Sequence, residues 1–267
     1  MTDTAGPEKV ASAEQIGLSH REAAASGPRD AASWARKVDR LEVGPRDGVR
    51  GTNVAGRRLT GPVQGFGKMW QKTYRMDAGQ IPPEQAIATW REHFPEFWPK
   101  GNRFAGALTG LEPGDVALLD LAIGGGVKLS TGVFVLYADA ESFTLMTPQG
   151  HMFAGWITFS AQRSGDTTEV QAQVLMRAND PLYEISMIVA GHRKEDKFWA
   201  ATLTALGQRL GIAEPAVVTT STCVDSRRQW RHARNIWHNS MVRSVLQTLA
   251  APVTGLRRTL KHGAVKS

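Results

Sequence analysis

Residues 142–178 read SFTLMTPQGHMFAGWITFSAQRSGDTTEVQAQVLMRA, and this stretch decides the fold class. It holds three runs that are rich in the β-branched and aromatic residues that favour strands. The runs are 142–147, 152–163 and 167–177. Their separators, Pro148-Gln149-Gly150 and Ser164-Gly165-Asp166, consist of turn-forming residues. Because parallel strands need long crossover connections, these short separators predict neighbouring antiparallel strands.

The pattern of strands and turns continues on both sides of this stretch. Further strands are expected at 68–75, 116–123, 127–137 and 182–189. With the three central runs they predict an antiparallel sheet of about six or seven strands.

Two segments have helical spacing instead. Ile87, Trp90 and Phe94 predict a short helix that begins near Pro82. A longer helix is expected from about Gly191 to Gly211, with four charged residues on its solvent side and an apolar stripe facing the sheet. The charged residues are Lys194, Glu195, Asp196 and Lys197, and the stripe is Phe198, Leu203, Leu206 and Leu210. A long helix that covers one face of an antiparallel sheet gives an α+β domain.

Several phrases of the sequence carry a family resemblance. They are GPVQGFG at 61–67 with WQKTY at 70–74, FPEFWP at 94–99, LMTPQGH at 145–151, GWITFS at 155–160 and DPLYE at 180–184. With the order of elements, these phrases resemble the START-like, polyketide-cyclase-like (SRPBCC) superfamily, and within it an uncharacterised actinobacterial branch, a domain of unknown function. The resemblance covers about residues 53–212 and implies a helix-grip fold with a cavity between sheet and helix. This superfamily includes lipid carriers, hormone receptors, cyclases and stress proteins, so the fold alone does not fix the function.

Composition sets the expected boundaries. Residues 1–52 are rich in small and charged residues and are expected to be disordered or loosely structured. The helix-grip domain follows at 53–212, then a linker at 213–225 and a C-terminal arm at 226–267. Residues 223–267 hold nine lysines and arginines against one acidic residue, so the arm accounts for the whole net charge of +7.

The arm predicts a basic amphipathic helix that begins at Ser226 and ends at Pro252. Its apolar positions step by three or four: Trp230, Ala233, Trp237, Met241, Val245 and Leu249. The residues expected to contact a membrane or another anion are Arg227, Arg228, Arg231 and Arg234. Docking of this helix on the domain and attachment to an anionic membrane surface both remain open. Nucleic acid is disfavoured, because the arm has no reader motif.

His151 is the candidate catalytic residue. It follows the Pro148–Gly150 turn at the entrance of a strand, where it can hydrogen-bond a ligand or act as a base. A histidine that only closes the turn is the alternative.

Other candidate ligand contacts come from period-two alternation. A polar set on the strands is Thr158, Gln171 and Gln173, and the apolar wall candidates are Trp70, Trp90, Met146, Trp156, Tyr183 and Trp199. The sequence leaves open which face of the sheet is inside, since a slip of one residue reverses the answer.

Several chemistries lack their sequence signals. Gly124-Gly125-Gly126 has no Gly-Lys-Ser/Thr ending, no Gly-x-Ser-x-Gly elbow occurs, and the seven histidines are scattered, so we expect no metal and no cofactor. Cys223 is the only cysteine, and no secretion signal or long apolar span is present, so a cytoplasmic location is expected, with contact at the inner membrane face as a variant.

The sequence therefore supports three functional hypotheses. The first is binding of a hydrophobic small molecule or lipid between sheet and long helix. The others are a cyclase or aromatase type enzyme using His151, and peripheral membrane association through the arm. The oligomeric state stays open.

Overall fold

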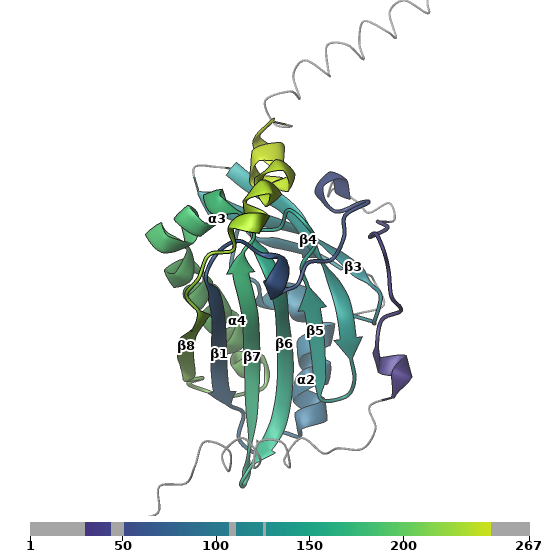
Figure 1. Ribbon diagram of the computed structural model, residues 1–267. Helices are drawn as coiled ribbons and strands as arrows, with labels where there is room; N and C mark the ends of the chain where they lie inside the picture. Colours follow the sequence, from purple (N-terminus) through teal and green to yellow (C-terminus); the bar gives the residue numbers. More distant parts are fainter. Residues whose placement is uncertain (1–29, 44–50, 107–110, 125–126, 247–267) are drawn as a thin grey trace, which may run out of the picture. The chain divides into compact units, whose positions relative to one another are not determined.

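The computed structural model describes residues 30–43, 51–106, 111–124 and 127–246 (Figure 1). The chain divides into two units, 1–33 and 34–267. In the first unit the described part is a short 3-10 helix, Ala31–Ser33. The fold and the pocket described below belong to the second unit.

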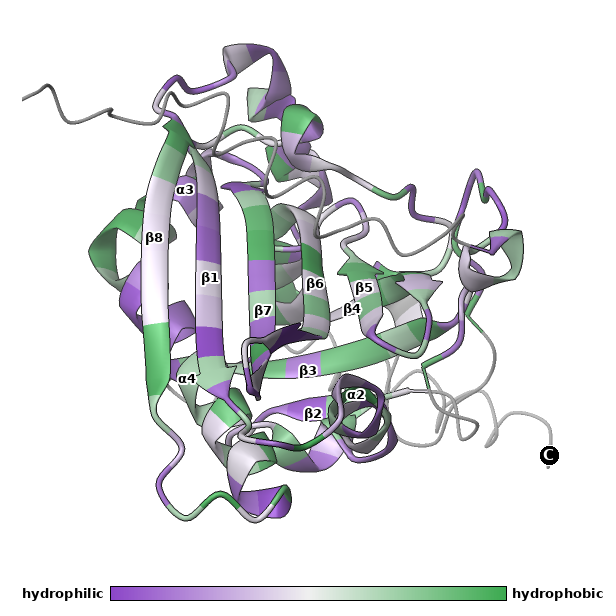
Figure 2. Cartoon of the chain, turned by 90° about the horizontal axis from the view of Figure 1, so that it is seen from below, coloured by the Kyte–Doolittle hydropathy of each residue, from purple (hydrophilic) through white to green (hydrophobic). Residues whose placement is uncertain are grey.

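The core of the second unit is a sheet of eight strands in the order β2-β3-β4-β5-β6-β7-β1-β8, with every neighbouring pair antiparallel. The strands are β1 (Met69–Asp77), β2 (Arg103–Ala105), β3 (Val116–Gly124), β4 (Val127–Ala138), β5 (Ser142–Met146), β6 (Phe153–Ser164), β7 (Thr167–Ala178) and β8 (Val217–Asp225). Figure 2 shows the sheet bending, so that β3 runs across the direction of β1, β7 and β8. This curvature gives the sheet a concave face.

Helices cover the concave face. The helix α2 (Pro83–Glu92) packs on β6 and β7, and α3 (Pro181–Ser186), the π-helix η5 (Met187–Gly191) and α4 (His192–Arg209) run on as one helix of 29 residues. The side chain of Asp180 starts this long helix by accepting hydrogen bonds from the N–H groups of Leu182 and Tyr183. The result is a helix-grip fold of the α+β class, as the sequence predicts.

Alternation along the strands separates the two faces of the sheet. On β6, Ile157 and Phe159 are buried toward the helices, whereas Trp156 and Thr158 are half-buried on the other face. Aromatic side chains fill the core beneath α2: Trp90 lies 4.9 Å from Phe159 between ring centroids. On the opposite face, a second cluster of Leu41, Val54, Val116, Leu118 and Phe134 packs over β3 and β4.

Part of the N-terminal region is more ordered than expected. Residues 34–43 belong to the second unit, and Leu41 is only 2% exposed in the second cluster. The expectation of loose structure for 1–52 is therefore wrong for this part. Residues 1–29 and 44–50 lie outside the described residues.

One expected strand and part of the expected linker need correction. Residues 182–189 are helical, because Asp180 and Pro181 form a helix start that outweighs the strand-like apolar run. Residues 217–225, within the expected linker, form β8, which pairs with β1. This strand is rich in β-branched residues but exposed along most of its length, and in Figure 2 its middle is pale between green ends.

The arm also departs from the prediction. Instead of one helix from Ser226, it forms a 3-10 helix, η6 (Trp230–His238), followed by an α-helix over 240–246. Asn239 separates them, because its side-chain oxygen caps the second helix by accepting hydrogen bonds from Met241 N–H and Val242 N–H. Residues 247–267, with Leu249 and Pro252, lie outside the described residues.

Candidate ligand-binding pocket

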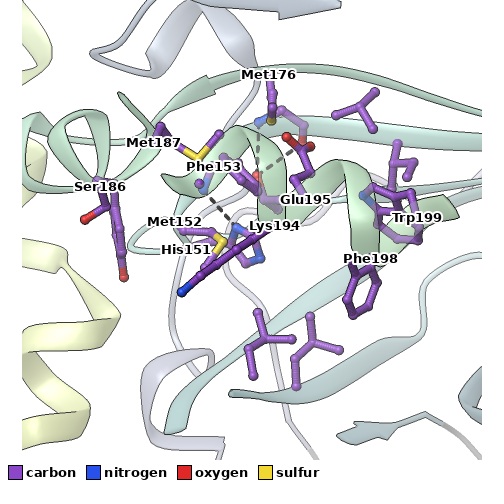
Figure 3. Close-up of a pocket in the computed structure, with 18 of the residues that line it drawn as sticks. His151, Met152, Phe153, Met176, Ser186, Met187, Lys194, Glu195, Phe198 and Trp199 are labelled. Atoms are coloured by element: carbon purple, nitrogen blue, oxygen red, sulfur yellow. Dashed lines mark hydrogen bonds between the residues drawn. The ribbon is translucent and has the colours of Figure 1, made fainter. Parts of the chain in front are cut away.

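A pocket of about 580 Å³ lies between the concave face of the sheet and the long helix (Figure 3). Most of its wall is apolar. The sheet contributes Leu119, Leu121, Val133, Leu145, Ile157, Val174 and Met176, and the helix contributes Met187, Val189, Phe198 and Trp199. This composition suits an apolar guest, because contact with it removes apolar surface from water.

The π-helix η5 forms part of this wall. Met187, Val189, Ala190 and Gly191 all line the pocket. A Cβ at Gly191 would lie 2.4 Å from Met187 Sδ, so only glycine leaves Met187 its place. Val189 is 76% exposed although it lines the pocket, so the pocket reaches the surface beside this segment. Single π-turns inside α-helices are frequent at functional sites.

His151 lies in the pocket wall and is only 6% exposed. Its Nδ1 accepts a hydrogen bond of 3.0 Å from Phe153 N–H, so the neutral ring carries its proton on Nε2. Burial lowers the pKa of His151 to about 4, since the charged ring would lose its hydration. At neutral pH the ring is therefore uncharged, and its Nε2–H is a hydrogen-bond donor in the pocket wall.

The loop that carries His151 is held by the C-terminal segment. Gly150 has a φ of +92°, and a Cβ there would lie 2.1 Å from the carbonyl oxygen of His238. Ser240 N–H also donates to Gly150 O at 2.9 Å. The start of the arm thus positions the histidine by packing against the turn before it.

A charge cluster lies behind the pocket. Lys72 on β1 is buried, and its Nζ lies 3.0 Å from Glu195 Oε2 and 2.7 Å from Asp196 Oδ1 on α4. The hydroxyl of Tyr74 donates to the same Asp196 oxygen at 2.8 Å. Burial raises the pKa of Glu195 to about 7, and the nearby Lys72 charge opposes this rise. Glu195 lines the pocket, so the expectation that it faces solvent is wrong.

The sequence-based ligand candidates separate into two groups. His151, Trp156, Tyr183 and Trp199 are at the pocket. Trp156 contributes atoms to the pocket wall, but its ring lies on the outer face of the sheet. There it is close to Gly61 and Met146, since the Cβ position of Gly61 is 3.6 Å from Trp156 Cζ3 and 3.7 Å from Met146 Cε.

The other six candidates do not line this pocket. Trp90 is part of the aromatic core, and Trp70 is on the helix-facing side with its ring 4.8 Å from that of His192. Met146, Thr158, Gln171 and Gln173 are on the outer face, where the Thr158 hydroxyl meets Thr144 and Gln171 donates to Ser160. The polar set is thus the outward-facing set.

The four arginines of the arm that are candidate anion contacts are exposed, and some are paired. Arg228 Nε donates to Glu184 Oε1 at 3.0 Å, and Arg227 Nε donates to Asp225 Oδ1 at 3.1 Å. Arg231 and Arg234 belong to η6, the same 3-10 helix that holds the exposed Trp230 and Trp237.

Within the described ranges, no three His, Cys, Asp or Glu residues come together in a way that could hold a metal ion. No helix of those ranges is long and apolar enough to cross a membrane.

Comparison with known proteins gives structural neighbours only. No family model matches this chain, and no curated protein matches it. A START superfamily protein from Mycobacterium smegmatis has 25% sequence identity over 54% of this chain and 99% of that chain, with a TM-score of 0.38. The di-domain ARO/CYC of the steffimycin biosynthetic pathway has 9% identity over 54% of this chain and 50% of that chain, with a TM-score of 0.41.

Ara h 8.0201 is another neighbour, with 11% identity over 53% of this chain and 97% of that chain, and a TM-score of 0.40. These TM-scores are low. The helix-grip fold is therefore assigned from the chain's own strand order and long helix, with which these neighbours are consistent.

Proposed function

We propose that this protein binds an apolar small molecule or lipid in the pocket between the sheet and the long helix. The observation that carries the proposal is the pocket itself, with its largely apolar wall and a volume of about 580 Å³. Small-molecule sites generally have volumes of roughly 300 to 1,000 Å³ and pair an apolar wall with a few polar groups. His151 supplies such a group here.

Native mass spectrometry of the protein, purified without detergent or organic solvent, tests this proposal. A discrete added mass that disappears on denaturation is the expected result. A bare protein mass, together with failure to take up any of a panel of apolar dyes, would contradict the proposal.

Membrane association through the arm is a second candidate, and the exposure of its tryptophans favours it. Trp230 is 74% exposed and Trp237 is 81% exposed, on the same 3-10 helix as Arg231 and Arg234. Tryptophan prefers the membrane interface, and each basic residue near an anionic surface adds about 1 kcal/mol.

Sedimentation with vesicles tests this second candidate. Replacing Arg227, Arg231 and Arg234 together by Gln should weaken binding to phosphatidylglycerol-containing vesicles by about a hundredfold. Binding to purely zwitterionic vesicles is the control and should be weak for both proteins. Equal binding of both proteins to the anionic vesicles would exclude these three arginines as the membrane contact.

A further inference from the structure

The polar groups of the pocket wall fall into two classes, those that the protein already satisfies and those that it leaves free. The Thr147 hydroxyl donates to Gly155 O and accepts from Gly155 N–H, and the Ser186 hydroxyl donates to Leu182 O. The Asn102 side chain donates to Pro99 O and accepts from Ala122 N–H. The hydrogen-bonding groups of these side chains are therefore already paired within the protein.

One carboxylate, that of Glu195, also belongs to the wall. Both carboxylate oxygens of Glu195 are inaccessible, and Oε2 lies 3.0 Å from Lys72 Nζ. Glu195 therefore contributes to the wall without offering its oxygens to a guest.

Among the described side chains of the wall, the groups that are both free and accessible are donors. No described residue accepts a hydrogen bond from His151 Nε2–H, and His151 lines the pocket. The Tyr183 hydroxyl accepts from Met241 N–H, which leaves its own proton to donate. Lys194 adds an exposed ammonium group to the same wall. Leaving a buried donor without an acceptor costs free energy, so these groups favour a guest that supplies one.

We infer that the ligand is an apolar molecule whose polar end is a hydrogen-bond acceptor oxygen, a carbonyl or a carboxylate, and that His151 Nε2–H donates to it. This inference rests on the proposed binding function and specifies the chemistry of the guest. Its geometric basis is a buried ring that is fixed by the Phe153 N–H on one side and open to the pocket on the other (Figure 3). Burial, which keeps the ring neutral, matches a role as donor rather than base.

Three biphenyl probes test the inference by isothermal titration calorimetry. The first is 4-acetylbiphenyl, which carries a carbonyl acceptor. The second is 4-isopropylbiphenyl, which has a similar shape and no acceptor, and the third is biphenyl-4-carboxylate. His151→Phe removes the donor and keeps a ring, whereas His151→Gln places an amide N–H close to the position of Nε2.

His151→Phe should weaken binding of 4-acetylbiphenyl by about tenfold, the size expected when one buried hydrogen bond is lost. Binding of 4-isopropylbiphenyl should change less than twofold, and His151→Gln should restore most of the ketone affinity. A similar loss for both probes, or no loss for the ketone, would overturn the inference. Failure of wild-type protein to bind any biphenyl would count against the proposed function itself.

Two further measurements complete the test. The carbonyl infrared band of 4-acetylbiphenyl bound to wild-type protein should shift to lower wavenumber than in an apolar solvent, and an unshifted band would contradict the inference even if the variants fail to fold. Binding of biphenyl-4-carboxylate that falls in Lys194→Met would identify a carboxylate as the preferred acceptor. Tighter binding of the ketone than of the carboxylate would identify a carbonyl.

Discussion

Three charged residues lie close together behind the pocket, and two of them are buried. Lys72 is fully buried between two carboxylates, and only one of them, Asp196, is partly exposed. Glu195 has a side chain that is 5% exposed, and burial raises its pKa to about 7. A carboxyl whose pKa is raised in the folded state binds its proton more tightly there than in the unfolded chain. Its contribution to stability is therefore full at low pH and is lost as the pH rises through 7.

Glu195→Gln should remove this pH dependence. The free energy of unfolding of the wild type, minus that of the variant, should fall by about 2 kcal/mol between pH 5 and pH 8. Urea unfolding at the two pH values measures it. His192, whose pKa is lowered by burial, is present in both proteins and cancels in the difference, and burial raises the pKa of Tyr74 further above this pH window.

Asp196→Asn is the matched control for this prediction. It removes the other carboxylate that meets Lys72 but leaves Glu195 in place. The variant should keep a pH-dependent loss of stability between pH 5 and pH 8. A difference between wild type and Glu195→Gln that is the same at both pH values would contradict the account.

The sequence predicted some site residues and missed others for a physical reason. His151 was identified because it follows a turn at a strand entrance, a position that structure places in the pocket wall. Lys72 and Glu195 were missed because charged residues are almost never buried unless they are paired, and their pairing joins positions far apart in the sequence. The alternation along β1 does indicate that Lys72 is buried, because Lys72 shares a face with the buried Tyr74 and Met76.

Among the elements, the turn before β6 links the arm to the pocket. Gly150 has a left-handed φ of +92° and its Cα lies against the backbone of His238. A side chain at this position would strain the backbone, and it would also collide with the main chain of His238, which cannot move aside as a flexible side chain can. The turn, the arm and the position of His151 therefore depend on one another.

Gly150→Ala should lower the free energy of unfolding by about 3 kcal/mol or more, from strain and collision together. Gly165→Ala is the matched control, because Gly165 also has a positive φ, +62°, but no atom within 4 Å of the Cβ position. It should cost only about 1 to 2 kcal/mol. Urea unfolding of the two variants gives both values, and equal costs would contradict the contact between the turn and the arm.

Elements were predicted well where their periodicity is long and poorly where local rules compete. The central strands and α4 followed from alternation and helical spacing. The apolar run at 182–189 fits either a strand or a helix by composition, and the Asp180-Pro181 start decides it. The Thr/Ser run 219–222 of β8 is typical of a linker, although an edge strand that is exposed on its surface needs no apolar alternation.

At the scale of the whole second unit, the pocket results from the distance between two layers. The sheet curves away from α3, η5 and α4, while α2 and the aromatic core fill the space elsewhere. The sequence indicates both layers and the residues on their facing sides. It does not give the separation of the layers, which depends on packing between residues far apart in the chain, so the volume of the pocket could not be predicted.

The most direct test of the account is a comparison of Val174→Trp with Gln173→Trp. These neighbours on β7 face opposite sides of the sheet: Val174 lines the pocket and is 5% exposed, whereas Gln173 is on the outer face beside Thr158. Calorimetric titration with 4-acetylbiphenyl measures binding to each folded variant. Val174→Trp should abolish binding, whereas Gln173→Trp should leave the dissociation constant within about twofold of wild type. Equal affinity of the two variants would show that the guest does not lie between the sheet and the long helix.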